Sequence, residues 1–137
     1  MQALTSFFNY SLKMKPLKIL KRVKAMKCFI FLLGIFIGSF LNVCIYRIPI
    51  RQSIFFPPSQ CPQCKNFLKP MDLIPILSYI LRKGKCRYCQ NSISVQYPLV
   101  ELFNGILYVL IFIEYHLTIE FFKYSLFVSL LLVISCI

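Results

Sequence analysis

The sequence has 137 residues, of which 58% are hydrophobic and 15% are charged, and its formal net charge is +12. This composition excludes a disordered chain and argues against an ordinary soluble domain, which is rarely so apolar. Sixteen Lys and Arg residues stand against four acids, and in an apolar chain such an excess is typical of segments that flank membrane spans. With four acids and one histidine, the chain holds little material for acid–base catalysis or carboxylate metal sites.

The first predicted membrane helix covers residues 28–46. Its segment CFIFLLGIFIGSFLNVCI carries no charge and is long enough to cross most of a bilayer core as a helix. A cleaved signal peptide is the alternative, but the run is long for one and no small-residue cleavage site follows it. Residues 1–27 form a basic extension. A single membrane crossing cannot place both this extension and the basic loop after the helix in the cytoplasm, so we expect translation to start at Met26. The alternative is a basic amphipathic helix on an anionic membrane surface.

Residues 47–97 form a proline-rich loop with eight basic residues and one acid, which the positive-inside rule places in the cytoplasm. Two apolar segments follow, at 98–115 and 121–137, and predict a second and a third membrane helix joined by an outward turn at 116–120. No basic residue follows the third segment, so we expect that helix to be incomplete. The predicted fold class is a mainly α membrane protein with about three transmembrane helices and a small zinc-stabilised loop domain after the first.

Two CxxC motifs in this loop are the strongest chemical signal. Cys61 and Cys64 form the first, Cys86 and Cys89 form the second, and twenty-one residues separate them. Four thiolates at this spacing can surround one Zn²⁺ ion tetrahedrally at about 2.3 Å each. A fifty-residue polar loop buries little apolar area, and a structural zinc ion can supply on the order of 10 kcal/mol of apparent folding free energy. The sequence therefore predicts a zinc site with four cysteine ligands.

Disulfides or a redox-active CxxC are the alternatives for these four cysteines. Disulfides would need an oxidising compartment, which disagrees with a cytoplasmic loop. Because all four zinc ligands would come from the protein, the site would be closed and structural rather than catalytic. The other three cysteines, Cys28, Cys44 and Cys136, lie in membrane segments and are expected to be small apolar packing residues.

Five further residues are candidates for packing or function. Gly34, Gly38 and Asn42 recur every four residues, which predicts a packing seam in which Asn42 hydrogen-bonds a neighbouring helix; a substrate contact is the alternative. Glu101 lies within the second membrane segment, where a carboxylate is a functional candidate, but it can also reach headgroups or a basic loop residue. Asp72, the one acid of the loop, is predicted to form a turn or a helix N-cap.

Six short segments recur together in one known family. In chain order they are GSFLNV (38–43), YRIP (46–49), CPQC (61–64), DLIPILSY (72–79), GKCRYC (84–89) and ISVQYPLVEL (93–102). They closely resemble the N-terminal part of type IV prepilin peptidases, the bifunctional leader peptidase/N-methyltransferases of bacterial inner membranes. The resemblance covers about residues 26 to 137 in the family's order and spacing. Departures are small, such as Leu73 where many members carry Asn and Gln96 where many carry Arg.

The resemblance implies a function that composition and spacing do not show. Family members cleave the leader of prepilin-like proteins after a glycine and then methylate the new N-terminus with S-adenosylmethionine. In this family, hydrolysis rests on two membrane-embedded aspartates, one of them in a GxGD motif. The chain has neither, because Asp72 is its only aspartate and belongs to the loop. We therefore assign no catalytic residue, and the site for S-adenosylmethionine is unknown, with Gly84 and Glu101 as candidates.

Two hypotheses of different classes follow. In the first, the chain is a truncated or split prepilin peptidase whose C-terminal peptidase half is lost or encoded separately. In the second, it is a non-enzymatic, membrane-anchored zinc module that binds prepilin or pilus-assembly partners. Both predict prepilin-like proteins and the lipid bilayer as partners, with the zinc loop on the cytoplasmic side of the bacterial inner membrane. Nucleic acid is not expected as a partner, because the loop shows no platform of aromatic and basic residues.

Overall fold

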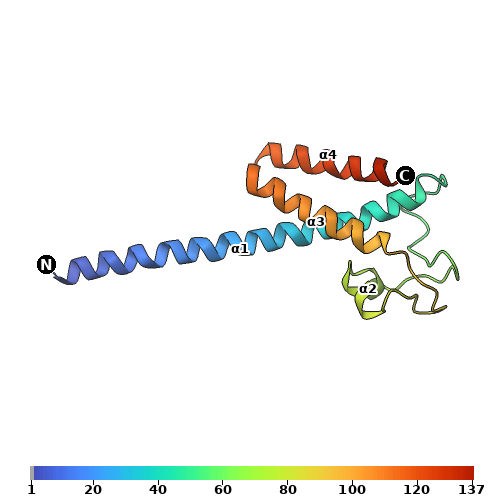
Figure 1. Ribbon diagram of the computed structural model, residues 1–137, viewed down its shortest axis with the longest axis horizontal. Helices are drawn as coiled ribbons and strands as arrows, with labels where there is room; N and C mark the ends of the chain where they lie inside the picture. The colour runs from blue at the N-terminus through green and yellow to red at the C-terminus, as the bar shows by residue number, and fades with distance from the viewer. Residues whose placement is uncertain (1) are drawn as a thin grey trace.

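The computed structural model describes the backbone of residues 2–137 and the side chains of residues 19–137. Over this range the chain forms α1 (Gln2–Arg47), the 3₁₀ helix η1 (Pro70–Leu73), α2 (Leu77–Leu81), α3 (Gln96–Tyr115) and α4 (Ile119–Cys136). Figure 1 shows α1 along the whole length of the molecule, α3 lying across its second half, and α4 returning beside α3. The irregular loop between α1 and α3, with α2 in it, lies on the side away from α4.

Three helices are long and apolar enough to cross a membrane. Among the described residues these candidate spans are Ile19–Arg47, Gln96–Tyr115 and Ile119–Cys136. The predicted fold class is confirmed, since the chain is helical with three candidate spans and a four-cysteine cluster between the first two. From Gln2 onward, the basic segment expected as a separate extension continues α1 without a break. A translation start at Met26 stays a prediction.

Glycines bring α1 and α3 into close contact. A Cβ atom built on Gly34 or Gly38 would lie 2.8 Å from a Cα atom of α3, so neither position has room for a side chain. Asn42 donates a hydrogen bond from Nδ2 to the carbonyl of Tyr97, the second residue of α3, at 2.9 Å. The packing seam predicted from these two glycines and Asn42 is confirmed.

A buried polar network joins the three long helices. Asn104 of α3 is fully buried and donates from Nδ2 to the carbonyl of Gly34 in α1 at 2.7 Å. Its Oδ1 accepts a bond from the hydroxyl of Ser129 in α4 at 3.4 Å, and that hydroxyl also bonds Tyr108 at 3.1 Å. Polar side chains between membrane helices bond one another because lipid offers them no other partner. The network thus fixes the order and register of the helices.

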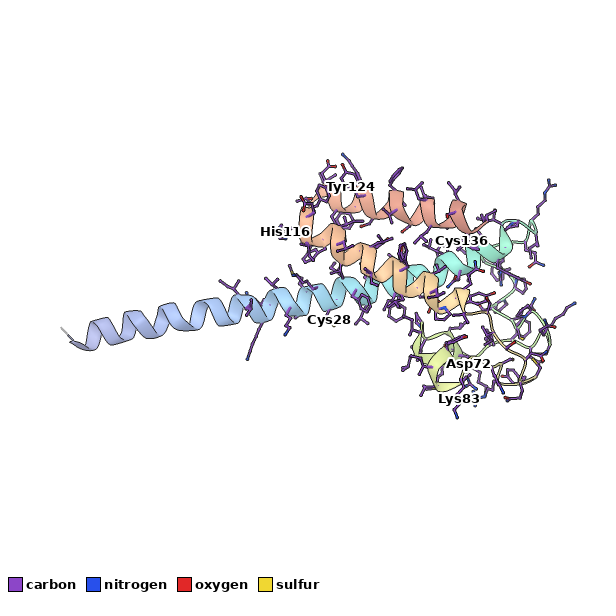
Figure 2. The ribbon with its side chains drawn as sticks, viewed as in Figure 1. Cys28, Asp72, Lys83, His116, Tyr124 and Cys136 are labelled. Atoms are coloured by element: carbon purple, nitrogen blue, oxygen red, sulfur yellow. The ribbon has the colours of Figure 1, made fainter. Side chains whose placement is uncertain are left out.

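Two apolar clusters complete the helix packing. One consists of Leu41, Cys44, Ile45, Val100 and Val133, and the other of Ile30, Tyr108, Phe112 and Phe121. Cys44 is buried and Cys136 packs partly buried against the first cluster, as predicted for membrane cysteines. The prediction was wrong for Cys28, which is exposed because neither α3 nor α4 covers its side of α1 (Figure 2).

The loop between α1 and α3 is held differently. No residue of η1 or α2 is buried as a whole, so neither helix contributes an apolar side chain to a buried core. What fixes the loop is a set of polar contacts and the cluster of cysteines, which together position the candidate site.

Candidate metal centre

Four cysteine sulfurs meet in the loop. The Sγ atoms of Cys61 and Cys89 are 3.9 Å apart, those of Cys64 and Cys86 are 4.0 Å apart, and all four lie within 4.8 Å of one another. Cys61 and Cys86 are buried, while the other two are partly exposed. Each close pair joins one cysteine from each CxxC motif, so the chain between the motifs folds back on itself.

The two CxxC motifs have the same local fold. In each, the N–H of the first cysteine donates to the carbonyl five residues later, at 3.0 and 2.9 Å, and its carbonyl accepts from the N–H four residues later, at 2.9 and 3.2 Å. That fourth residue has a left-handed backbone in both, with φ of 54° and 59°. The residues involved are Cys61, Lys65 and Asn66 in the first motif and Cys86, Gln90 and Asn91 in the second. The two motifs share the pattern C-x-x-C-x-N, present as CPQCKN and CRYCQN, a signal for this repeat that cysteine spacing alone does not use.

The sulfur positions fit one tetrahedral metal ion. Four sulfurs bound at about 2.3 Å to one Zn²⁺ would lie about 3.8 Å from one another, close to the 3.9 Å between Cys61 and Cys89 and the 4.0 Å between Cys64 and Cys86. An all-thiolate ligand set favours Zn²⁺ or another thiolate-binding metal. The cluster of Cys61, Cys64, Cys86 and Cys89 could therefore hold a metal ion, and these are the four residues that the sequence predicted.

Backbone N–H groups prepare one of these thiols for a metal. The N–H of Cys89 and that of Tyr88, which lies 3.5 Å from the Cys86 sulfur, lower the pKa of Cys86 to about 7 against the effect of burial. The N–H of Asn91 also lowers the pKa of Cys89, but desolvation and the neighbouring cysteine sulfurs outweigh it and raise that pKa to about 11. Because four adjacent thiolates repel one another, full ionisation of the cluster requires a cation among them.

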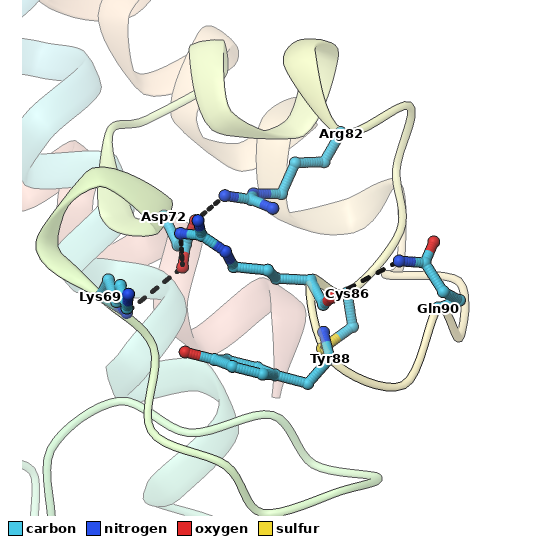
Figure 3. A network of polar contacts seen from close by, with 7 residues as sticks. Lys69, Asp72, Arg82, Cys86, Tyr88 and Gln90 are labelled. Atoms are coloured by element: carbon cyan, nitrogen blue, oxygen red, sulfur yellow. Dashed lines mark hydrogen bonds and ion pairs between the residues drawn. The ribbon is translucent and has the colours of Figure 1, made fainter.

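Asp72 links η1 to the second cysteine motif. Figure 3 shows its carboxylate paired with Arg82 and in contact with the backbone of Lys69. The carboxylate accepts the N–H of Lys69 at 3.3 Å and lies 3.9 Å from the guanidinium of Arg87. The side chain of Asp72 is only 4% exposed. Of the two roles predicted for Asp72, the structure shows the turn. It is the third residue of η1 rather than its N-cap, because Lys69 precedes the helix.

Arg47, the last residue of α1, ties the start of the loop to the helix end. It is 6% exposed, and its two terminal nitrogens donate to four loop carbonyls, those of Ser53 (2.8 Å), Ile54 (3.2 Å), Pro57 (2.7 Å) and Pro58 (3.4 Å). The prediction from sequence used Arg47 only as a positive charge. The sequence does contain a signal for this role. An arginine at the end of an apolar helix offers several N–H donors, and the proline-rich loop after it has carbonyl acceptors but few N–H groups of its own.

Glu101 holds the loop against α3. Its Oε2 atom accepts the N–H of Ile76 at 2.7 Å, and the residue is 7% exposed. Ile76 has φ of 57°, which is strained for a β-branched residue, so this hydrogen bond to a buried carboxyl group stabilises an unfavourable turn. The predicted contact of Glu101 with the loop is confirmed in part, because its partner is a backbone N–H rather than a basic side chain.

A cavity of about 470 Å³ lies between the loop and the helices. This volume is in the range of small-molecule sites. Gly84, which the sequence offered as a candidate for the S-adenosylmethionine site, does not line this cavity. It lies against Tyr79 with φ of 69°, and a Cβ atom there would lie 2.8 Å from the tyrosine hydroxyl. The residues that carry the cavity's aromatic and charged groups are Tyr46, Arg47, Tyr97 and Glu101 from the helices and Lys65, Asp72, Tyr79, Arg82, Lys85 and Arg87 from the loop.

Residues 32–115 match the family described as "Bacterial Peptidase A24 N-terminal domain". The chain belongs to this family. The matched residues contain the last third of α1, the whole loop with its four cysteines, and α3. The resemblance drawn from the six sequence segments is confirmed.

Three relatives with the name "Prepilin leader peptidase/N-methyltransferase" extend this result. The protein of Bacillus subtilis (strain 168) is 40% identical over 106 residues, which are 77% of this chain and 43% of the relative. That of Myxococcus xanthus (strain DK1622) is 43% identical over 109 residues, 80% of this chain and 32% of the relative. That of Neisseria gonorrhoeae is 36% identical over 107 residues, 61% of this chain and 37% of the relative. The chain thus spans less than half the length of these relatives, and no solved structure matches it.

Proposed function

We propose that the chain is the N-terminal part of a prepilin leader peptidase/N-methyltransferase that acts on type IV prepilin-like proteins. The observation that carries this proposal is the family match across residues 32–115, with the four-sulfur cluster at its centre. Hydrolysis is not assigned to this chain. Its one aspartate, Asp72, lies in the loop and is paired with Arg82.

Zn²⁺ held by the four cysteines is the proposed structural cofactor. It would join the two CxxC motifs, and through them the two halves of a loop whose short helices bury none of their residues. With four protein thiolates bound, the ion keeps no open position for a substrate. Its role is therefore to hold the wall of the cavity, which both Cys61 and Cys86 line.

The cavity is the proposed site of S-adenosylmethionine and of the pilin N-terminus. Its residues fit such a ligand by chemistry, because tyrosine rings offer stacking surfaces for adenine, the carboxylate of Glu101 complements a positive charge, and Arg82 and Arg87 complement a carboxylate. The bound donor would supply the methyl group. The chain's own residues would bind and orient both partners and exclude water between the loop and the helices.

The proposed location is the bacterial inner membrane, with the loop on the cytoplasmic side. Exposed basic side chains on the loop, among them Arg51, Lys65 and Lys83, support this orientation. Proteinase treatment of sealed vesicles tests it. We expect the loop to be cut in inverted vesicles after zinc removal and to be protected in right-side-out vesicles, and the reverse result would overturn the orientation.

A processing assay tests the function. Membranes with this chain as the only prepilin-processing protein would receive full-length prepilin or pre-cleaved pilin, together with S-adenosylmethionine. Mass spectrometry would then read leader removal and N-terminal methylation separately. We expect methylation of pre-cleaved pilin without leader cleavage. The Cys61→Ser variant should lose methylation, while Cys28→Ser, which changes an exposed cysteine outside the cluster, should keep it.

Addition of a second part separates the two hypotheses. The remainder of the Bacillus subtilis relative, beyond the stretch that this chain matches, should restore leader cleavage when co-expressed. Leader cleavage by this chain alone would overturn the assignment of hydrolysis to another part. Absence of both leader cleavage and methylation, with and without that remainder, would contradict the enzyme proposal. That outcome would favour a zinc module that only binds prepilin.

A further inference from the structure

The segment 71–81, which contains η1 and α2, has its apolar side chains on the outside. Met71 is 74% exposed, Leu77 50%, Ile80 64% and Leu81 74%. The last three stand at positions i, i+3 and i+4 of one helix and so share one face. A contiguous exposed apolar face marks a surface that meets something other than water.

The polar side chains of the same segment are turned inward. Asp72 points to Arg82 and is almost fully covered, and the hydroxyl of Tyr79 donates to the carbonyl of Ile93 at 3.3 Å. A domain surrounded by water would show the opposite arrangement, with apolar side chains inside. Lipid is the surrounding medium that suits this inverted pattern.

The depth of α2 agrees with a lipid environment. Ile76, the residue before α2, bonds Glu101, which stands five residues, or about 8 Å, inside the start of α3. Glu101 in turn lies against Gly38, nine residues or about 13 Å before the end of α1. Figure 1 shows α2 set back along the long axis from the end of α1. Since α1 and α3 are candidate spans, α2 begins at the depth where headgroups meet acyl chains.

Charge marks the water side of this boundary. Directly after Leu81 the sequence becomes basic, and the side chains of Lys83 and Lys85 are exposed. Basic side chains beside an apolar helix face are placed to meet the phosphates of anionic lipids. We propose that η1 and α2 lie in the interfacial layer of an anionic bilayer, with the exposed apolar side chains of 71–81 among acyl chains and these two lysines at headgroup phosphates.

Tryptophan fluorescence can test this placement cleanly, because the chain has no tryptophan. The full chain would be reconstituted in vesicles of phosphatidylcholine and phosphatidylglycerol as three variants. Leu81→Trp reports on α2, Phe36→Trp on an exposed position of a membrane span, and Tyr88→Trp on an exposed position between two zinc ligands. One zinc ion per chain in each variant would show that the loop is folded. Ile80→Trp replaces Leu81→Trp if that variant does not hold zinc.

The expected result is blue-shifted emission from Leu81→Trp, with strong quenching by lipids brominated near the headgroup and weak quenching by aqueous acrylamide. Phe36→Trp should likewise show blue-shifted emission and weak quenching by acrylamide, and Tyr88→Trp should show red-shifted emission and strong quenching by acrylamide. Replacement of both Lys83 and Lys85 by Gln in the Leu81→Trp chain should increase its quenching by acrylamide. Acrylamide quenching of Leu81→Trp as strong as that of Tyr88→Trp would overturn the proposal. Protection from both quenchers would overturn it as well, since protein rather than lipid would then cover α2.

Discussion

The membrane helices and the loop hold their shapes by different means. α1, α3 and α4 are joined by many small contacts, namely close backbone approach at glycines, the Asn104 network and two apolar clusters. In the loop, whose helices η1 and α2 bury none of their residues, four sulfurs, an ion pair and a few hydrogen bonds are the fixed points. Stability is therefore spread out in one region and concentrated in the other. A single substitution should unfold the loop more readily than the helices.

The largest effect is expected at the cysteine cluster. Cys61→Ser or Cys86→Ser removes a proposed metal ligand, and a structural zinc ion is worth on the order of 10 kcal/mol of apparent folding free energy. The loop should unfold while the helices persist. Limited proteolysis in inverted membranes and zinc content per chain would measure this.

The control for this prediction is Cys28→Ser, which changes an exposed cysteine of α1. It should keep both zinc and protease resistance. Unchanged protease resistance in the Cys61 and Cys86 variants would refute a structural metal and remove the main difference between the two regions.

The second largest effect is expected in the helices, from Gly38→Leu. A Cβ at this position would lie 2.8 Å from the Cα of Glu101, so α1 and α3 must move apart, at about 3 kcal/mol for severe overpacking. Circular dichroism during unfolding in sodium dodecyl sulfate would measure the loss. Phe40→Leu, at a 51% exposed position of α1, is the control and should change little.

Zinc binding in the Gly38→Leu variant tests whether the loop and the membrane helices unfold independently. All four proposed ligands lie between residues 61 and 89, so the loop should keep its zinc although the helix contact is weakened. Loss of zinc together with the helix contact would show that the two regions unfold as one unit.

A smaller effect is expected where the two regions join. Arg47→Lys keeps the charge but loses the planar fork that reaches four loop carbonyls, and charge-assisted bonds of this kind contribute about 2 kcal/mol. The start of the loop should open about thirtyfold more often. Chymotrypsin cleavage after the exposed Phe55 would measure it. Arg51→Lys, at an exposed position, should leave cleavage unchanged, and equal cleavage in both variants would contradict the role of Arg47.

Two features of the structure could be predicted from local sequence patterns. Hydropathy predicted the three candidate spans, and CxxC spacing predicted the four sulfurs that meet in the loop. The contact between Ile76 and Glu101, twenty-five residues apart, and that between Asn104 and Gly34, seventy apart, could not be predicted in this way. Each depends on which helix faces another and at what register, and neither hydropathy nor spacing encodes that.

The environment of the exposed side of α2 could not be predicted from the sequence either. An apolar run such as LIPILSYIL indicates a segment with a covered face, and the sequence alone does not say which medium covers it. Only the positions of Ile76 beside Glu101 and of Asp72 beside Arg82 show that the polar groups face the protein. The inverted pattern is thus a property of the tertiary fold.

The smallest effect is expected at the ion pair of the loop. Asp72→Asn keeps an acceptor for the N–H of Lys69 but removes the charge that faces Arg82, and a partly exposed pair is worth about 1 kcal/mol or less. Zinc transfer to a chelator should become up to about fivefold faster. In the unchanged chain the transfer rate should rise with salt, because screening weakens the pair, whereas the variant should be insensitive. Glu120→Gln, which removes an exposed pair with Lys123 in α4, should leave zinc transfer unchanged. A salt-dependent rate in Asp72→Asn would mean that other charges, and not this pair, hold η1 to the second cysteine motif.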